Sequence, residues 1–363
     1  MDLQKLDIQN LLKLMVKSGI SDIHFKANAI PLIRIHGKLI SSQFTQITPE
    51  FVRKIAYYFM NDAQQKIFEE ENELDMSYSI EGLSRFRINL YKQRGTIALT
   101  LRVIPSQIKT FEDLNLPINI LKKLASESHG LILIAGITGS GKTTTMNSLI
   151  DYININYEKN IISVEDPIEY YHYDKKSSIS QREVGLDTKS FKNALKYVLR
   201  QDPDVICIGE MREYEAVAAA ITAAETGHLV ISTIHTIDAV QTIDRIIDSY
   251  PSHQQGQIRA QLSNVIKGII AQRLCIRSDM EGRIPASEVF IGTPLVKKLI
   301  LENKIQELYK ALIQGDFYGM HTFDQDLGRL VKEKKISEQE ALDKAQNPED
   351  LTLRLKGITL EGQ

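Results

Sequence analysis

The chain has 363 residues, of which 43% are hydrophobic and 25% are charged. This length exceeds that of a typical single domain, so two domains are expected, and the composition is that of a globular protein with a buried core. The formal net charge of −2 gives no electrostatic case for nucleic acid as the main partner. Cys207 and Cys275 lie far apart in apolar runs, which excludes a disulfide framework and favours a reducing compartment.

The first part of the chain alternates between helical and strand-like patterns. Residues 3–17 place Leu, Ile and Met at helical spacing, and Thr48 reads as the N-cap of a second helix over 48–60. Together with the strands, these helices predict a small α+β domain over residues 1–103. The alternation typical of strands occurs in residues 21–25, 31–40, 75–80, 84–93 and 96–105.

The pattern changes after a proline-bounded connector over residues 104–117. Short apolar runs then alternate with helical segments, which predicts a mainly parallel sheet with both faces covered. We therefore expect an α/β domain over 118–363, whose remainder from about 252 to 358 is mostly helical. Strands are predicted at 130–136, 161–166, 205–210 and 228–235, and helices at 118–127, from about 141, at 190–200 and at 213–225.

One segment has the pattern of a phosphate-binding loop. Residues 136–143 read Gly-Ile-Thr-Gly-Ser-Gly-Lys-Thr and fit G-x-x-x-x-G-K-[ST] completely, between an apolar strand and a helix, a context that disfavours a chance match in a glycine-rich turn. Glycines let successive N–H groups face a phosphate, and the positive end of the helix strengthens that field. We expect Lys142 to reach the β- and γ-phosphates of ATP, and the Thr143 hydroxyl to hold Mg²⁺. The other predicted nucleotide contacts are Gly136, Thr138, Gly139, Ser140, Gly141 and Thr144.

Acidic residues follow two of the predicted strands. Glu165 and Glu169 accompany the strand at 161–166, and Glu210 ends the strand at 205–210. In such sheets, ligands bind at the carboxyl ends of the strands. One carboxylate can orient Mg²⁺ through water and another can polarise the attacking water, although many acids at strand ends are simply solvated. These residues alone do not decide which carboxylate is the base.

Four spaced motifs resemble those of one family, the secretion-type ATPases that power type II secretion and type IV pili. Residues 199–212 resemble its signature LRxxPDxxxxGEMRD, with Glu213 in place of the final Asp. SVEDPIE (163–169) is similar to the Asp box of the family, and AETGHLVISTIHT (224–236) is similar to its His box. QREVG (181–185) also matches, and the motifs follow in the family's order.

Within this family the chain looks most like the pilus-retraction branch, without separating its PilT and PilU types. SDIHF (21–25) and PLIRIHGKL (31–39) resemble the N-terminal domain of that branch, and GMHTFDQDL (319–327) resembles its C-terminal segment. Extension and secretion members generally have a longer N-terminus. Many of them carry a four-cysteine zinc module, which two distant cysteines cannot build. Residues 295–302 keep the helical character of a family segment like AIRNLIRE but lack its arginines.

The resemblance implies roles for individual residues. Glu169 would be the general base of the Asp box, with Glu165 as a further acidic candidate. Glu210 would be the Walker B glutamate, which holds Mg²⁺ through water. His228 and His235 would link the nucleotide state to subunit contacts, where a purely structural histidine is the alternative. His235 also ends a predicted strand, at the edge where ligands bind.

Four arginines of the N-terminal domain are expected to lie on its strands. A solvated strand face is the commonest fate of arginine, but a guanidinium can also bridge phosphate oxygens as charge develops in transfer. By resemblance, Arg87 and Arg102 match the nucleotide-sensing arginines of the family, and Arg85 and Arg94 are lesser candidates. The resemblance also implies a PAS-like N-terminal domain and a RecA-like P-loop core.

The resemblance further implies a homohexamer that acts on an inner-membrane platform protein (PilC-like) at the base of a pilus. A paralogous retraction or extension ATPase is a further candidate partner. No run approaches ~18 consecutive apolar residues, and residues 1–10 carry acids without an apolar core. We therefore expect a cytoplasmic protein without direct membrane insertion, associated peripherally with the inner membrane through the pilus machinery.

The predicted function is that of a hexameric motor that hydrolyses ATP to drive type IV pilus retraction and twitching motility. An extension or secretion ATPase of the same family is the first alternative. A nucleotide-gated binding module that hydrolyses ATP poorly is the second. A nucleic-acid motor is the third, and the near-neutral charge disfavours it.

Overall fold

The computed structural model describes residues 7–35, 38–80, 83–104 and 108–357. The chain divides into two compact units, the first comprising Met1–Gln107 with Glu169–Tyr171 and the second comprising the rest. The boundary falls within the predicted connector, whose own extent stays a prediction. The following parts of predicted segments lie outside the described residues: 3–6, 36–37, 105–107 and 358.

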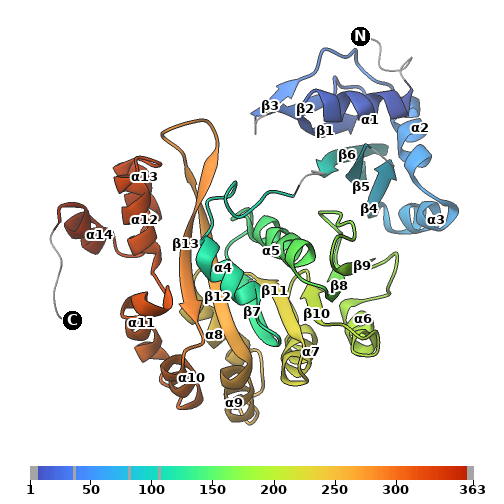
Figure 1. The fold of residues 1–363 in the computed structure, drawn as a ribbon. Coiled ribbons are helices and arrows are strands. Elements are labelled where there is room, and N and C mark those ends of the chain that lie inside the picture. The colour runs from blue at the N-terminus through green and yellow to red at the C-terminus, as the bar shows by residue number, and fades with distance from the viewer. Residues whose placement is uncertain (1–6, 36–37, 81–82, 105–107, 358–363) are drawn as a thin grey trace. The chain divides into compact units, whose positions relative to one another are not determined.

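The first unit is an antiparallel sheet with helices on it, in the order β3-β2-β1-β6-β5-β4 (Figure 1). This arrangement confirms the predicted α+β class. The elements are α1 (Ile8–Lys17), β1 (Ile20–Lys26), β2 (Leu32–Ile35), β3 (Lys38–Ser41), α2 (Pro49–Phe59), α3 (Asp62–Glu71), β4 (Glu73–Ile80), β5 (Ser84–Gln93) and β6 (Thr96–Ile104).

Alternation along the strands decides which face of this sheet is buried. Phe86, Ile88 and Leu90 of β5 are fully buried against the helices, because successive side chains point to opposite faces. Thr48 caps α2 as predicted, its side chain accepting a hydrogen bond from the N–H of Phe51. The sequence analysis missed α3, although the capping box of Asn61 and Gln64 was a readable signal.

The second unit is built on a seven-stranded sheet in the order β13-β12-β7-β11-β10-β8-β9. Neighbouring strands are parallel except for the antiparallel pair of β12 and β13, which confirms the predicted mainly parallel sheet. Every residue of β7, β10 and β11 is buried, as expected when helices cover both faces. The strands are β7 (Gly130–Ala135), β8 (Asn160–Glu165), β9 (Ser178–Glu183), β10 (Val205–Ile208), β11 (Leu229–Ile234), β12 (Ile266–Ile276) and β13 (Arg283–Ile291).

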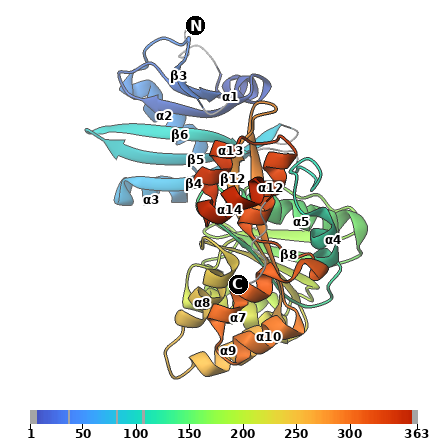
Figure 2. The same ribbon diagram turned by 90° about the vertical axis from the view of Figure 1, so that its left-hand side faces the viewer.

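Helices cover the two faces of this sheet unequally. α4 and α5 lie on one face, and α7, α8 and α9 lie on the other, as Figure 2 shows with the sheet between them. The chain crosses from β7 to β8 and later returns through β10 and β11 to β12. Because connections between parallel strands are right-handed, the helices of the outward and return paths cover opposite faces of the sheet. The helices are α4 (Ile118–Ala125), α5 (Lys142–Asn156), α6 (Phe191–Val198), α7 (Tyr214–Glu225), α8 (Ala239–Asp248), α9 (Gln255–Val265), α10 (Pro294–Leu301), α11 (Ile305–Ile313), α12 (Phe323–Lys332), α13 (Glu338–Lys344) and α14 (Pro348–Leu355), with the short 3-10 helix Asp316–Tyr318.

The prediction that residues 252–358 are mostly helical is wrong for one long hairpin. β12 and β13 pair from Gly268 opposite Ile291 to Ile276 opposite Arg283, and β12 also joins the parallel sheet beside β7. The hairpin is the long ribbon labelled β12 and β13 in Figure 1. Its β-branched residues favour a strand, and pairing with β7 outweighs the helical pattern of the flanking segments. The prediction also missed β9.

Candidate nucleotide site

The predicted phosphate loop joins β7 to α5 and curls as its glycines permit. Gly136, Gly139 and Gly141 have φ angles of 152°, 78° and 93°. A Cβ atom at Gly136 would lie 2.3 Å from the Oγ of Ser140 and 2.8 Å from the carbonyl oxygen of Gln272. Only glycine fits at that position. Because α5 begins directly after Gly141, the positive end of the helix opens on this loop.

The side chains of the loop fit a phosphate ligand. The buried Nζ of Lys142 donates hydrogen bonds to the carbonyl oxygens of Gly136 (2.8 Å) and Ile137 (3.0 Å). The Oγ of Ser140 is buried and has no hydrogen-bond partner within the described part of the chain. A phosphate oxygen would supply the acceptor that this hydroxyl lacks. Thr143 is the first hydroxyl after Lys142, as a Mg²⁺ ligand of a triphosphate requires.

Glu210 and His235 meet at the carboxyl ends of β10 and β11, beside the loop. The Oε1 of Glu210 lies 3.1 Å from the Nε2 of His235, and its Oε2 lies 2.8 Å from the guanidinium of Arg212. Desolvation and then the nearby charge of Lys142 lower the pKa of His235, while Glu210 opposes that shift. The fold thus brings Lys142, Glu210 and His235 together at one edge of the sheet.

Glu165, the other acidic candidate, lies inside the second unit. It ends β8, and its side chain is 2% exposed. Its Oε1 accepts hydrogen bonds from the hydroxyl of Ser163 (2.7 Å) and the amide of Gln181 (3.1 Å). Its predicted catalytic role stays a prediction.

Glu169 lies in the short segment Glu169–Tyr171, which groups with the first unit, and its side chain is half-buried. The residues on either side, Ile168 and His172, belong to the second unit. Its predicted role as the general base stays a prediction.

His228 lies at the opposite end of β11 from His235. It precedes the strand, and its Nδ1 lies 3.0 Å from the carbonyl oxygen of Ala223, so Nδ1 carries the proton of that hydrogen bond. Six strand residues at about 3.3 Å each separate the two histidines by roughly 20 Å. The fold of a single chain therefore does not bring His228 to the phosphate loop, and its predicted role between subunits stays a prediction.

The arginine candidates occupy different parts of the first unit. Arg87 and Arg102 are register partners on β5 and β6. Arg87 pairs with the carboxylate of Asp75, and the Nε of Arg102 lies 2.7 Å from an oxygen of the buried Asp22. The structure therefore brings these two arginines together, each beside a carboxylate of the same unit.

The two lesser arginine candidates differ from that pair. Arg85 is buried and contacts Ser77 and Tyr171. The prediction that Arg94 lies on a strand is wrong, because Arg94 forms the turn between β5 and β6 with a φ angle of 48°. The predicted nucleotide contacts of all four arginines stay predictions.

Sequence reasoning missed a buried polar pair behind the loop. Asn147, on α5, is fully buried, and its Oδ1 lies 2.7 Å from the Nε2 of His172. Asn147 falls one helical turn after Thr143, and His172 follows the Asp box. No clear signal in the sequence marks this pair, because polar residues recur among the buried positions of α5.

The chain is similar to proteins of one family over almost its whole length. A family model described as Type II/IV secretion system protein matches residues 3–359. The chain belongs to this family. It is 41% identical over 345 residues to the type IV pilus retraction ATPase PilT of Pseudomonas aeruginosa, covering 95% of this chain and all of that protein. It is 40% identical over 351 residues to the type IV pilus ATPase PilU of the same organism, covering 97% and 92%.

A solved relative agrees with this assignment to the secretion ATPases. A crystal structure of the pilus retraction motor PilT with bound ADP matches with a TM-score of 0.89 at 43% identity, covering 96% of this chain and 99% of that one. This match confirms the predicted RecA-like class for this family member. The nearly equal identities to PilT and PilU leave the two types unseparated, as the motifs did.

The segment that lacks the family's arginines is helical, as predicted. Residues 295–301 belong to α10, where the Nζ of Lys297 donates to the carbonyl oxygen of Asn264 at 3.1 Å. Lys298 is 67% exposed and pairs with Glu302. Lysines thus supply positive charge on this helix.

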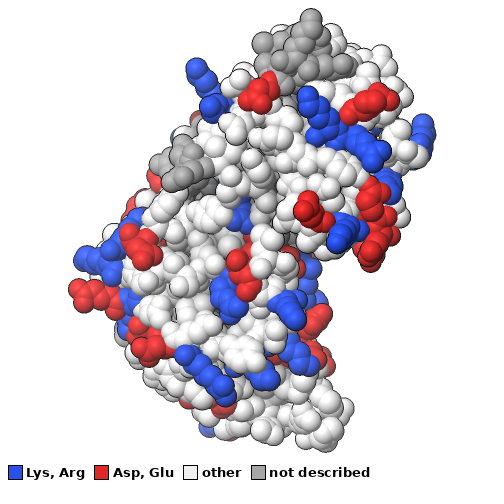
Figure 3. Space-filling view, turned by 90° about the vertical axis from the view of Figure 1, so that its right-hand side faces the viewer, with Lys and Arg blue, Asp and Glu red and all other residues white. Residues whose placement is uncertain are grey.

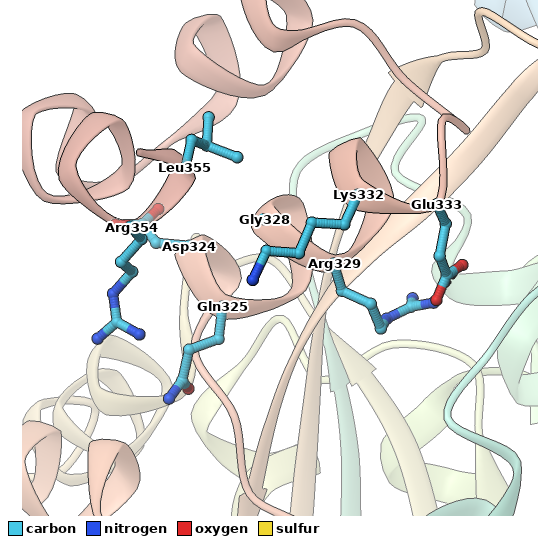
Figure 4. A pocket seen from close by; sticks show the side chains of 8 residues that line it. All are labelled: Asp324, Gln325, Gly328, Arg329, Lys332, Glu333, Arg354 and Leu355. Atoms are coloured by element: carbon cyan, nitrogen blue, oxygen red, sulfur yellow. Dashed lines mark hydrogen bonds and ion pairs between the residues drawn. The ribbon is translucent and has the colours of Figure 1, made fainter. Parts of the chain in front are cut away.

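A separate pocket lies between α12 and α14, away from the phosphate loop. Figure 4 shows Lys332 and Arg354 among the side chains that line it. Arg329, the third cationic side chain of this pocket, forms ion pairs with the carboxylates of Asp326 and Glu333. Charges of both signs are also intermixed over the face of the molecule in Figure 3.

Among the residues with described positions, no three or more His, Cys, Asp or Glu side chains group as a metal centre requires. Across the same residues, no helix has both the length and the apolar character needed to cross a bilayer. The candidate site combines the phosphate loop and its Lys142 with Glu210, Arg212 and His235, a set suited to phosphoryl transfer to water.

Proposed function

We propose that this chain is an ATP-hydrolysing motor that drives the retraction of a type IV pilus. The observation that carries the proposal is the glycine-curled loop with Lys142, beside the pair of Glu210 and His235. The similarity to PilT over the whole of that protein supports retraction over the extension and secretion alternatives.

The reaction is the attack of water on the γ-phosphorus of ATP. A P–O bond forms to the water oxygen, and the bond to the bridging β–γ oxygen breaks, which releases ADP and phosphate. Lys142 donates hydrogen bonds to the β- and γ-phosphate oxygens, and Glu169 takes the proton from the attacking water. Thr143, and Glu210 through water, would hold Mg²⁺, which would supply positive charge to neutralise the phosphate oxygens.

Other parts of the proposal rest on the family resemblance. Arg87 and Arg102 sense the nucleotide, and His228 and His235 pass its state to neighbouring subunits. The working assembly is a homohexamer that acts on a PilC-like platform protein in the inner membrane, with a paralogous ATPase as a further partner. Steps in which domains move against one another would convert hydrolysis into force.

Pilus imaging in a strain that lacks this gene tests the direction of force. We expect surface pili to accumulate in the deletion strain and to return to the parental number when the wild-type gene is restored. The Lys142→Ala gene should not restore that number. Loss of pili in the deletion strain would instead assign the chain to pilus extension.

A further inference from the structure

The chain that carries Glu169 is fixed to the second unit immediately before and after that segment. On the near side, the N–H of Ile168 donates to the buried carboxylate of Glu183 at 3.0 Å. On the far side, the N–H of His172 donates to the side-chain oxygen of Gln181 at 2.9 Å. Only three residues separate these anchors, so Glu169 can move only a few ångströms along the chain from either one.

A side-chain bridge ties the far anchor to the phosphate-loop helix. The Nδ2 of Asn147 donates to the carbonyl oxygen of Thr143 at 2.9 Å, and this fixes the orientation of the amide because a carbonyl can only accept. The Oδ1 of Asn147 must then accept from the Nε2–H of His172, at 2.7 Å in a fully buried contact. Two hydrogen bonds thus connect His172 to the residue that follows Lys142.

The side chains that accept the two anchoring hydrogen bonds, those of Gln181 and Glu183, belong to one motif to which no role has yet been given. Gln181 and Glu183 are the first and third residues of QREVG, at the end of β9. The Gln181 amide also donates to Glu165, the buried last residue of β8. This motif therefore braces both sides of the loop through side chains rather than through strand pairing alone.

We propose that His172, with Gln181 and Glu183, forms a clamp that positions Glu169 relative to the phosphate loop. His172 acts through Asn147 on the helix of Thr143, so it is a positioning residue rather than a catalytic one. The inference rests on the proposed function, because it takes Glu169 as the base. Displacement of a catalytic group by about 1 Å can cost roughly 100-fold in rate, which sets the scale of the expected effects.

His172→Phe tests the clamp, because it keeps a ring of similar size but removes the N–H that Asn147 accepts. We expect kcat for ATP to fall about 10- to 100-fold, with the KM for MgATP and the affinity for MgADP within about twofold of wild type. His172→Gln places an N–H near the lost one and should recover part of kcat.

A double-mutant cycle of His172→Phe and Glu169→Gln separates a loss of Glu169 positioning from general damage to the protein. If His172 acts through Glu169, His172→Phe lowers kcat no further in the Glu169→Gln background. Independent losses that multiply in the double variant would overturn the proposal.

Asn154→Ala is the matched control. Asn154 is a second buried asparagine on α5, and it holds the next part of the same loop by bonds to Tyr173 and Lys175. We expect this variant to lower the thermal unfolding midpoint as much as His172→Phe but to keep kcat within about twofold. Equal losses of kcat in the two variants would mean that any damage to this loop lowers turnover, and would overturn the proposal.

Failure of the clamp differs from failure of the proposed function. Normal kcat in a folded His172→Phe protein, with Lys142→Ala inactive, rejects the clamp and leaves the ATPase intact. Equal phosphate release by wild type and Lys142→Ala rejects the ATPase itself.

Discussion

Two loops of the second unit are held in place by different means. The phosphate loop, residues 136–143, is shaped by its own backbone: three glycines with positive φ angles and a lysine that bonds to loop carbonyls. The Asp-box loop, residues 166–172, is held by side chains from α5 and β9, which are distant in sequence. The first loop is therefore a local structure, and the second depends on the assembled sheet.

This difference predicts that nucleotide binding and turnover can be separated by mutation. Changes in the phosphate loop remove groups that contact the nucleotide in every state, so they lower affinity as well as rate. Changes around the Asp-box loop and at Glu210 affect groups used in the transition state, so they lower kcat with little effect on binding.

Lys142→Ala should show the largest effect. It removes the only side-chain charge that the phosphate loop itself carries, so phosphate release should fall at least about 10²- to 10³-fold. Steady-state phosphate release measures this, with Lys196→Ala, an exposed lysine on α6, as the control that keeps wild-type activity. Equal phosphate release by Lys142→Ala and wild type would mean that the phosphate loop does not catalyse the reaction, and would leave the chain at most a nucleotide-binding module.

Glu210→Gln should come next and should act on turnover alone. The amide keeps a hydrogen-bond partner for His235 but loses the negative charge, so kcat should fall about 10²-fold. Single-turnover hydrolysis with saturating MgATP checks this. A normal rate in this variant would remove Glu210 from the mechanism.

Two glycine substitutions sharpen the account of the local loop. In Gly136→Ala, the new Cβ would lie 2.3 Å from the Oγ of Ser140 and 2.8 Å from the carbonyl oxygen of Gln272. In Gly139→Ala, no atom would lie within 4 Å of the new Cβ. Gly139→Ala therefore adds only backbone strain of about 1–2 kcal/mol, or roughly tenfold in affinity, and Gly136→Ala should cost more. Titration with MgADP compares them, and equal affinities would contradict a loop shaped by close contact at Gly136.

Glu288→Gln should change stability without changing either loop. Burial raises the pKa of Glu288 to about 7 from 4.5, and its Oε1 accepts a hydrogen bond from the first residue of α8. The folded protein thus holds the proton more tightly than the unfolded chain does. The resulting stabilisation is complete below pH 4.5 and is lost as the pH rises to about 7, at a cost of about 3 kcal/mol.

Unfolding by denaturant at pH 4.5 and at pH 8 measures this difference. Relative to wild type, Glu288→Gln should gain stability at pH 8 because its amide stays neutral. Its kcat should stay within about twofold of wild type. A constant difference between the two proteins across this pH range would mean that Glu288 titrates normally.

The sequence predicted the local features of the site and most of the fold. The phosphate loop, the position of Glu165 at the end of β8, and the positions of Glu210 and His235 just after β10 and β11 follow from contiguous patterns of glycine, apolar runs and strand ends. These features depend on neighbouring residues, so a single sequence is enough to find them.

Features that depend on distant partners could not be read in this way. The β12–β13 hairpin owes its strand character to pairing with β7, and the bridge from Asn147 to His172 joins residues whose contact depends on the packing of α5. QREVG was recognised as a motif, but its anchoring role appears only when β9 is placed beside β8. Equally, His228 and His235 share one motif but lie at opposite ends of a strand.

Equilibrium binding of MgATP to Lys142→Ala and Glu169→Gln, measured side by side with wild type, tests the separation of binding from turnover most directly. The account predicts that Glu169→Gln binds like wild type yet hydrolyses ATP at least about tenfold more slowly, whereas Lys142→Ala loses detectable affinity. Wild-type affinity in Lys142→Ala, or wild-type turnover in Glu169→Gln, would contradict it.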